Sequence, residues 1–286
     1  MSVRIAHTID ECRAAVHAER RQWRRIALVP TMGALHDGHL SLVDRARELA
    51  DTVVVSVFVN PTQFGAGEDF EHYPRDLERD VRLAEERGAA VVFAPAVKEM
   101  YPRPSLTTVT MQGITDDLEG AHRPGHFDGV LTVVTKLFHI VQPDVAVFGQ
   151  KDAQQAAAIR RMVEDLDFPV EIVVGATIRE PDGLALSSRN AFLTRENRRE
   201  ALALHAALGR AEALVSEGVD AADRLLGAMR DELARHPAVE VDYVALVERD
   251  SFRPVSRLSG PSVAAVAARV GDTRLIDNVV IGPHER

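Results

Sequence analysis

The stretch of sequence that decides the fold is IALVPTMGALHDGH, residues 26–39. Its four apolar residues, 26–29, predict a buried strand, and the small residues that follow predict a turn into a helix. Backbone N–H groups at such a turn, and at the start of the helix, bind anions well. His36 and His39 can donate hydrogen bonds to a phosphoryl oxygen as charge develops on it. An ordinary turn with two surface histidines fits this short pattern equally well, so the rest of the chain has to decide.

The composition is that of a globular enzyme. The chain has 286 residues, 46% of them hydrophobic and 27% charged, which suits one large domain or two moderate ones. A formal charge of -9 disfavours nucleic acid as a partner, so we expect any bound polyanion to be small. The single cysteine, Cys12, excludes an internal disulfide and fits a reducing compartment. The longest apolar run, residues 53–59, is too short to span a membrane. We therefore expect a cytoplasmic protein that binds no membrane.

Short apolar runs alternate with amphipathic stretches over the first 175 residues. This alternation predicts a Rossmann-like parallel sheet with helices on both faces. The expected strands are 26–29, 53–59, 90–94, 145–148 and 170–174, and the expected helices are 40–50, 76–87, 129–141 and 153–165. Residues 107–112 alternate more weakly, and we expect them to form an extra hairpin or an edge strand.

The pattern changes after about residue 177. Two long helices are followed by three strands, which predicts a smaller α+β unit. The expected helices are 194–217 and 221–235, and the expected strands are 239–247, 262–270 and 274–281. We therefore expect a Rossmann-like domain over residues 1–177, which binds the nucleotide and the second substrate, and a smaller α+β domain over residues 178–286 that covers the site.

Polar residues follow several predicted strands, at the edge of the sheet where open α/β proteins bind ligands. Asn60 and Gln63 are neutral amides that orient hydroxyl or carboxylate groups, although simple turn chemistry also explains them. Lys151 suits a phosphate and Asp152 suits ribose hydroxyls, although an acid at a helix start also complements the helix dipole.

Two loops carry further cationic and hydroxyl groups. Residues 186–190, LSSRN, are suited to close over a triphosphate, or they form a polar interdomain linker. Residues 122–129, HRPGHFDG, are expected to be a lid, an anion clamp or a solvated loop. Walker spacing and Cys/His metal spacing are both missing from the sequence, which disfavours P-loop chemistry and a zinc site.

Residues 29–36 (VPTMGALH), 58–64 (FVNPTQF) and 184–190 (LALSSRN) together resemble the pantoate–β-alanine ligase family, over nearly the whole chain. The resemblance implies a two-step reaction. The carboxylate of (R)-pantoate attacks the α-phosphorus of Mg-ATP to give pantoyl adenylate and pyrophosphate, and the amine of β-alanine then displaces AMP to give pantothenate. It also implies a homodimer, formed through the N-terminal domain.

The resemblance also implies roles for individual residues. It implies a catalytic group of His39, His36, Lys151 and Arg189, with His39 as general acid, although physically His39 suits a hydrogen-bond donor better than a proton shuttle. The implied ATP site consists of Met32, Gly33, His36, His39, Gly149, Lys151, Asp152, Ile178, Leu186, Ser187, Ser188 and Arg189. The implied substrate-binding amides are Asn60, Gln63 and Gln155. No protein ligand is assigned to Mg²⁺.

Three residues depart from the family pattern. Members often have glutamate at Gln150, an aromatic residue at Ala153 and methionine at Leu186. Two alternatives stay open at this point. One is another adenylate-forming or nucleotidyl-transfer enzyme, and the other is a non-catalytic nucleotide sensor. The amides favour a small hydroxy acid as second substrate, and the histidine pair with Lys151 and Arg189 favours an enzyme over a sensor.

Overall fold

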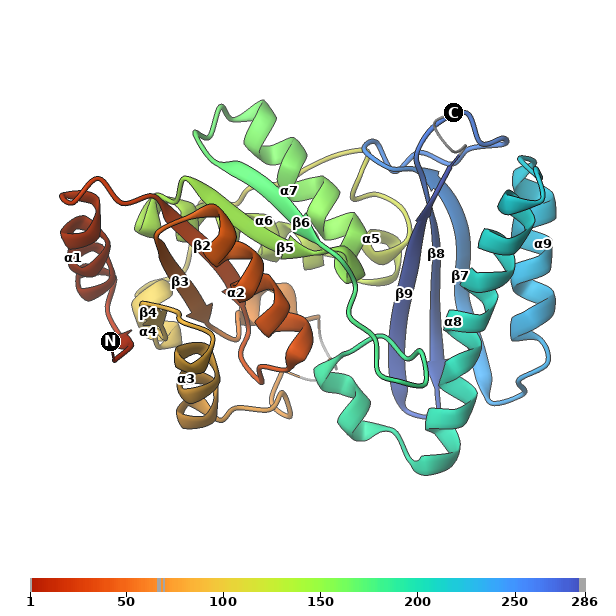
Figure 1. Ribbon diagram of the computed structural model, residues 1–286, viewed down its shortest axis with the longest axis horizontal. Coiled ribbons are helices and arrows are strands. Elements are labelled where there is room, and N and C mark those ends of the chain that lie inside the picture. Colours follow the sequence, from red (N-terminus) through yellow and green to blue (C-terminus); the bar gives the residue numbers. More distant parts are fainter. Residues whose placement is uncertain (1, 66–67, 69, 283–286) are drawn as a thin grey trace.

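The computed structural model describes residues 2–65, 68 and 70–282 and contains two sheets (Figure 1). The larger sheet has six strands in the order β1-β4-β3-β2-β5-β6, and all neighbouring pairs are parallel. Its strands are β1 (Arg4–Ala6), β2 (Ile26–Thr31), β3 (Thr52–Val57), β4 (Val91–Phe93), β5 (Val145–Gly149) and β6 (Glu171–Gly175). The chain runs from β2 to β3 and β4 on one side, and continues with β5 and β6 on the other. Strands β2 and β5 therefore flank the switch point, where ligands of such sheets bind.

Helices cover both faces of this sheet because its strands are apolar on both sides. Ile26 and Leu28 of β2 pack in one core, with α1, α6 and α7, whereas Ala27 and Val29 pack in the opposite core, with α2 and α3. The helices are α1 (Ile9–Arg20), α2 (Asp37–Leu49), α3 (Leu77–Glu86), α6 (His126–Val141) and α7 (Ala153–Asp165). Short helical turns connect them: α4 (Val97–Met100), α5 (Glu119–His122), and the 3₁₀ turns η1 (Pro61–Gln63) and η2 (Gln150–Asp152).

The C-terminal part is a three-stranded antiparallel sheet, order β7-β8-β9, covered on its outer face by two helices (Figure 1). Its elements are η3 (Ser188–Phe192), α8 (Arg195–Ser216), α9 (Ala222–Leu233), β7 (Val239–Glu248), β8 (Ser262–Val270) and β9 (Thr273–Ile281). Ala264 and Val266 of β8 pack under α8 and α9, whereas Val263 and Ala265 join the core formed by α6 and α7. The small sheet is thus sandwiched between its own helices and the large domain.

The predicted fold class is confirmed, with two differences in detail. Strand β1 and helix α1 are not among the elements expected from the sequence. The helix begins with a capping box from Thr8 and Glu11 and buries only a narrow stripe, Cys12, Ala15 and Val16, which gives weak periodicity. The prediction of a strand at residues 107–112 is wrong. All six residues are described and none is in a strand, and the Val109 N–H donates to Thr132 Oγ1 of α6 instead (2.9 Å). The division into domains at residue 177 stays a prediction.

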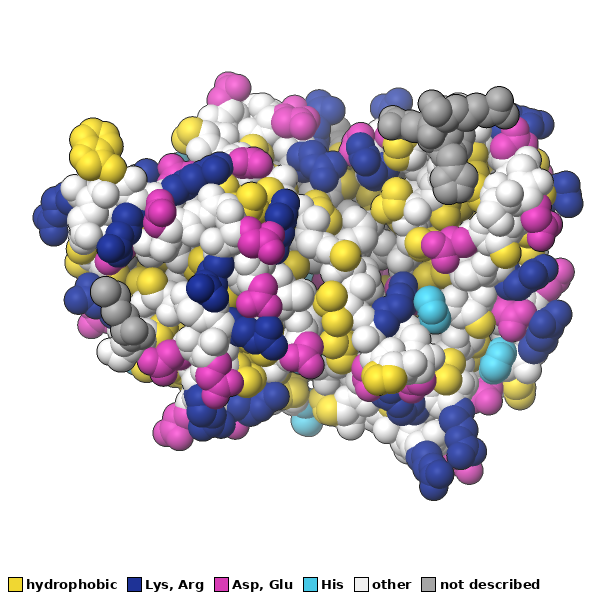
Figure 2. Space-filling view, viewed as in Figure 1, with side chains coloured by type: hydrophobic (Ala, Val, Ile, Leu, Met, Phe, Trp, Pro, Cys, Tyr) yellow, Lys and Arg dark blue, Asp and Glu magenta, His cyan; other side chains and the backbone are white. Residues whose placement is uncertain are grey.

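Figure 2 shows acidic and basic side chains interspersed over both parts of the molecule on the face drawn. Among the described residues, no helix combines the length and the apolar character needed to cross a membrane.

Candidate active site

A cavity of about 220 Å³ lies beyond the carboxyl ends of β2 and β5 and gathers residues from distant parts of the chain. The predicted site residues that line it are Met32, His36, His39, Asn60, Gln63, Gly149, Lys151, Asp152, Gln155, Ile178, Leu186, Ser187, Ser188 and Arg189. Gly33 is not among the described residues that line it. A groove of about 1620 Å³ adjoins the cavity on the side of the small sheet, and both are lined by Lys151, Asp152, Gln155, Ser187 and Arg189.

The two histidines lie against each other at the start of α2. Their ring centroids are 4.1 Å apart. His36 is the N-cap, and its Nδ1 accepts a hydrogen bond from the Gly38 N–H (3.2 Å), which leaves the proton of the neutral ring on Nε2. Nδ1 of His39 is buried and has no partner among the described residues.

Both imidazoles are neutral at physiological pH. Burial and the nearby Lys151 lower the pKa of His36 to about 4. Burial, His36 and Lys151 lower the pKa of His39 to about 3. Neutral rings beside a lysine can donate hydrogen bonds to an anion, but they hold no extra proton to give away.

These depressed pKa values predict that the fold weakens in mild acid. In the unfolded chain a histidine binds a proton below about pH 6.5, whereas the buried rings stay neutral down to about pH 4. The unfolded state therefore binds more protons, and each ring lowers the free energy of unfolding by about 1.4 kcal/mol per pH unit within that window. Denaturant titrations between pH 7.5 and 4.5 should show His39→Gln losing part of this slope. His139→Gln, on the exposed face of α6, should keep it; equal slopes in the two variants would contradict the assignment.

The turn before His36 holds a carboxylate of the protein itself. Gly33 and Ala34 both have positive φ, +93° and +50°, so successive N–H groups converge on one point. There the N–H groups of Ala34 and Leu35 donate to the carboxylate of Asp80 on α3, at 2.9 and 2.7 Å. Asp80 is only 1% exposed, and burial raises its pKa above the ordinary value. The sequence predicted an anion-binding turn, and this anion is Asp80. The predicted contact of Gly33 with ATP gains no support from this geometry.

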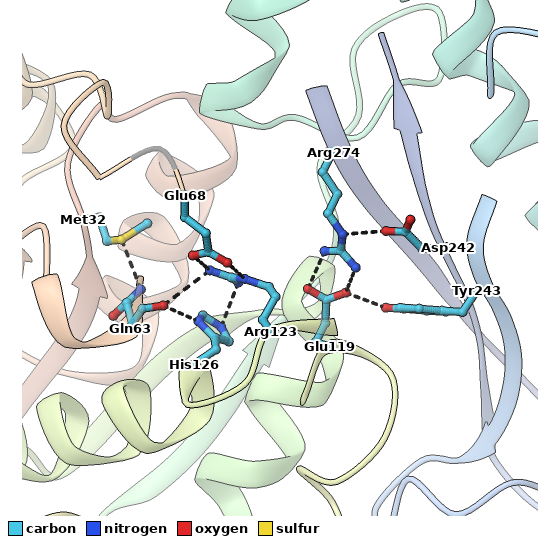
Figure 3. A network of polar contacts seen from close by, with 9 residues as sticks. All are labelled: Met32, Gln63, Glu68, Glu119, Arg123, His126, Asp242, Tyr243 and Arg274. Carbon is cyan, nitrogen blue, oxygen red and sulfur yellow. Dashed lines mark hydrogen bonds and ion pairs between the residues drawn. The ribbon is translucent and has the colours of Figure 1, made fainter. Parts of the chain in front are cut away.

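The amides after β3 form a buried hydrogen-bonded group. Asn60 Nδ2 donates to Gln63 Oε1 and to the Gly129 carbonyl, both at 3.1 Å, and Asn60 Oδ1 accepts from the Tyr101 hydroxyl at 2.9 Å. Asn60 is thus fully occupied by the protein. Gln63 Nε2 donates to a weak acceptor, Met32 Sδ, at 3.2 Å (Figure 3). Asn60 therefore orients the Gln63 side chain, and Gln63 lines the cavity.

Within residues 122–129, Arg123 and His126 pack against the site, whereas His122, Pro124 and Gly125 are exposed to solvent. Arg123, whose side chain is 16% exposed, donates through Nε and Nη2 to Glu68 at 2.7 and 2.8 Å (Figure 3). Burial and Arg123 lower the pKa of His126 to about 4. The neutral His126 accepts from Arg123 Nη1 (3.0 Å) and donates to the Gln63 carbonyl (2.9 Å). The predicted site includes neither Arg123 nor His126, although the cationic character of their segment is visible in the sequence.

A second network ties the large domain to the small sheet along the wall of the groove (Figure 3). Glu119 of α5 accepts two hydrogen bonds from Arg274 of β9, at 2.8 and 2.7 Å, and one from the Tyr243 hydroxyl at 3.0 Å. Arg274 also donates to Asp242 at 2.7 Å. Burial raises the pKa of Glu119, but the hydrogen bonds from Arg274 outweigh it and hold the pKa below its ordinary value. The Glu119 carboxylate is therefore ionised and paired with Arg274. We interpret this pair as structural.

The serine loop, residues 186–190, forms another wall of the cavity. Ser187 caps η3 by accepting from the Arg189 N–H at 3.3 Å. Ser188 Oγ donates to the hydroxyl of Tyr73 at 3.3 Å, and Tyr73, which is 5% exposed, lines the cavity. Tyr73 is not predicted from the sequence, because an aromatic residue in a polar loop carries no spacing that marks it as part of a site.

Comparison with known proteins agrees with this geometry. The sequence model of the pantoate-beta-alanine ligase family matches residues 4–280. The pantothenate synthetase of Moorella thermoacetica is 54% identical over 97% of this chain and 98% of its own. The crystal structure of pantothenate synthetase from Thermus thermophilus is 48% identical and superposes with a TM-score of 0.94 over 98% of this chain and 100% of that one. The pantoate-beta-alanine ligase of Francisella tularensis, crystallised with a β,γ-ATP compound and β-alanine, is 33% identical with a TM-score of 0.81, covering 97% of each chain.

An open parallel sheet with imidazole, lysine and arginine groups around a cavity at its switch point defines a nucleotide-binding α/β protein. The match over residues 4–280 and identities near half of all positions then decide the family. The chain belongs to the pantoate–β-alanine ligase family.

Proposed function

We propose that this chain condenses (R)-pantoate with β-alanine to give pantothenate, AMP and pyrophosphate, through pantoyl adenylate. The observation that carries the proposal is the convergence of two kinds of group on one cavity. Imidazole, lysine, serine and arginine side chains suit the phosphates of ATP, and the amides of Gln63 and Gln155 suit a small hydroxy acid. The ATP and β-alanine bound by the Francisella relative support the same substrates.

In the first step the carboxylate of pantoate attacks the α-phosphorus of ATP and pyrophosphate leaves. Gln63 and Gln155 hold pantoate, while His36, His39, Lys151 and Arg189 face the charge that grows on the phosphoryl oxygens. With pKa values of about 4 and 3, the two imidazoles act as hydrogen-bond donors. The balance of the step needs no added proton, because the carboxylate is already ionised and pyrophosphate leaves as an anion.

In the second step the neutral amine of β-alanine attacks the acyl carbon, the bond from that carbon to the phosphate oxygen breaks and AMP leaves. The proton that the nitrogen loses passes to the phosphate of AMP or to water. We assign the groove of about 1620 Å³ as the route of entry, because it opens into the cavity beside Gln155 and Lys151. The remaining residues, Met32, Gly149, Asp152, Ile178, Leu186, Ser187 and Ser188, would line the nucleotide, as the family resemblance implies.

Mg²⁺ enters this scheme as part of the substrate Mg-ATP. Among the described residues there is no group of three or more His, Cys, Asp or Glu side chains able to hold a metal. Mg²⁺ bound to nucleotides is commonly held by phosphates and water. A homodimer, implied by the resemblance, and a cytoplasmic location, expected from the composition, remain part of the proposal.

Exchange of labelled pyrophosphate into ATP tests the proposal. We expect exchange only when pantoate is present, because the adenylate must form before the reaction can reverse. Adding β-alanine should then release one AMP for each pantothenate formed. Exchange that is equally fast without pantoate would instead favour another adenylate-forming or nucleotidyl-transfer enzyme, and ATP binding without any exchange would favour a nucleotide sensor.

A further inference from the structure

Strand β9 carries a buried polar pair that the site described above does not use. Asp277 and Asn278 are 4% and 5% exposed, in a strand whose other inward residues are mostly apolar. Burying an amide and a carboxylate is unfavourable unless both are hydrogen-bonded. The Asn278 side chain is hydrogen-bonded to η2, and the Asp277 side chain is paired with Arg179, in the segment that leads to residues 186–190.

Asn278 holds the loop that carries Lys151. Its Nδ2 donates to the carbonyls of Gln150 and Lys151, at 3.0 and 2.8 Å. Its Oδ1 accepts from Gln150 Nε2 at 2.9 Å. Both protons of the Asn278 amide group are thereby used, so this side chain fixes two successive peptide units of η2.

Asp277 holds the loop that leads to Arg189. It accepts from Arg179 Nη1 and Nη2, at 2.6 and 3.0 Å, and Arg179 Nη1 also donates to the Gly183 carbonyl at 3.2 Å. Arg179 pairs with Ala185 in an antiparallel bridge, which returns the chain toward the serine loop. The Asp277 carboxylate also accepts locally, from the backbone N–H of Asn278 to its Oδ1 at 2.8 Å.

We propose that Asp277 and Asn278 are positioning residues that set Lys151 and Arg189 at the spacing an ATP polyphosphate requires. Adjacent residues of one strand reach two loops that come from different parts of the fold. The small sheet thus contributes to nucleotide binding through the backbone of η2 and through Arg179. This inference rests on the proposed function only in naming ATP as the ligand.

A double-mutant cycle between Asn278→Ala and Lys151→Ala tests the proposal, with ATP affinity measured by calorimetry. We expect Asn278→Ala to weaken ATP binding about 10-fold in the parent chain and less than about 2-fold in the Lys151→Ala background, because coupled residues are non-additive. Pantoate affinity should change less than about 2-fold, since Gln63 and Gln155 lie outside the two loops. Glu240→Gln, exposed on β7 of the same sheet, is the matched control and should leave both affinities unchanged.

Equal losses of ATP affinity in the two backgrounds, or an equal loss of pantoate affinity, would overturn the proposal and leave the pair a purely structural role. Should Asn278→Ala not fold, Gln150→Ala removes only one of the three hydrogen bonds, and the same cycle then applies with a smaller expected loss of about 3-fold. Because the cycle measures binding, its outcome is separate from pyrophosphate exchange. If the enzyme catalyses pyrophosphate exchange but the two losses of ATP affinity are additive, only the positioning role is contradicted. If the losses are coupled but no pyrophosphate exchange occurs, only the proposed reaction is contradicted.

Discussion

Replacing His39 with alanine should slow pantoate adenylation by about 10²–10³-fold, the usual effect of losing one donor to a transition state. His39 lines the cavity, and its Nδ1 is buried without a partner among the described residues. Buried polar atoms almost always have partners, and those that lack them tend to serve a function. The loss should fall on the rate of the chemical step, with a smaller change in the KM for pantoate, because the hydrogen bond strengthens as charge develops.

Single-turnover formation of the adenylate measures this effect directly. His39→Gln keeps an N–H donor and should recover part of the rate, while His139→Ala, exposed on α6, should match the parent. The pH profile separates a hydrogen-bond donor from a general acid. With a pKa of about 3, His39 carries no extra proton between pH 6 and 9, so the parent's rate should not decline through that range on its account. A decline with an apparent pKa near 6.5 that disappears in His39→Ala would show that the residue is a general acid.

The large sheet and much of the site can be predicted from sequence because their signals are local. The strand, turn and helix at residues 26–39 follow from a change of apolar period within fourteen positions, and the structure places β2 and α2 there. In a parallel sheet the carboxyl ends of strands meet at one edge. Knowing that Lys151 and Asn60 each follow a strand was therefore enough to predict that they meet.

The supporting residues could not be predicted, because their partners are distant in the chain. Asp80 sits in a helix whose sequence, LERDVRLAEE, is that of a solvated charged surface, yet it reaches a turn 45 residues away. Arg123 lies in a segment whose composition is typical of an exposed loop, but its side chain is paired with Glu68 beside the cavity. Asn278 interrupts an apolar strand, which is a signal of a buried polar contact, but nothing in the strand identifies the partner as Gln150.

Asp80→Ala should lower the free energy of unfolding by about 2–4 kcal/mol, because it leaves the buried N–H of Leu35 and the partly buried N–H of Ala34 without acceptors. The same change should slow adenylation about 10-fold or more. Without the carboxylate, the left-handed pair Gly33 and Ala34 loses the interaction that offsets its backbone strain, and Ala34 in particular costs about 1 kcal/mol or more there. His36, the N-cap of α2, follows two residues after Ala34. Relaxation of the turn would therefore displace His36 and His39 from the phosphate of ATP.

Urea unfolding and single-turnover adenylation check the two effects on the same preparations. Asp80→Asn preserves the shape but offers one acceptor and one amide group toward two donors, so it should lie between alanine and the parent in both measurements. Glu78→Gln, exposed two residues earlier in α3, removes a charge of the same sign and should change neither quantity appreciably. A stability loss in Asp80→Ala with full adenylation rate would mean that the turn supports only the fold. Losses in both would show that the protein's own carboxylate, held in a site suited to a phosphate, is what orients the histidines.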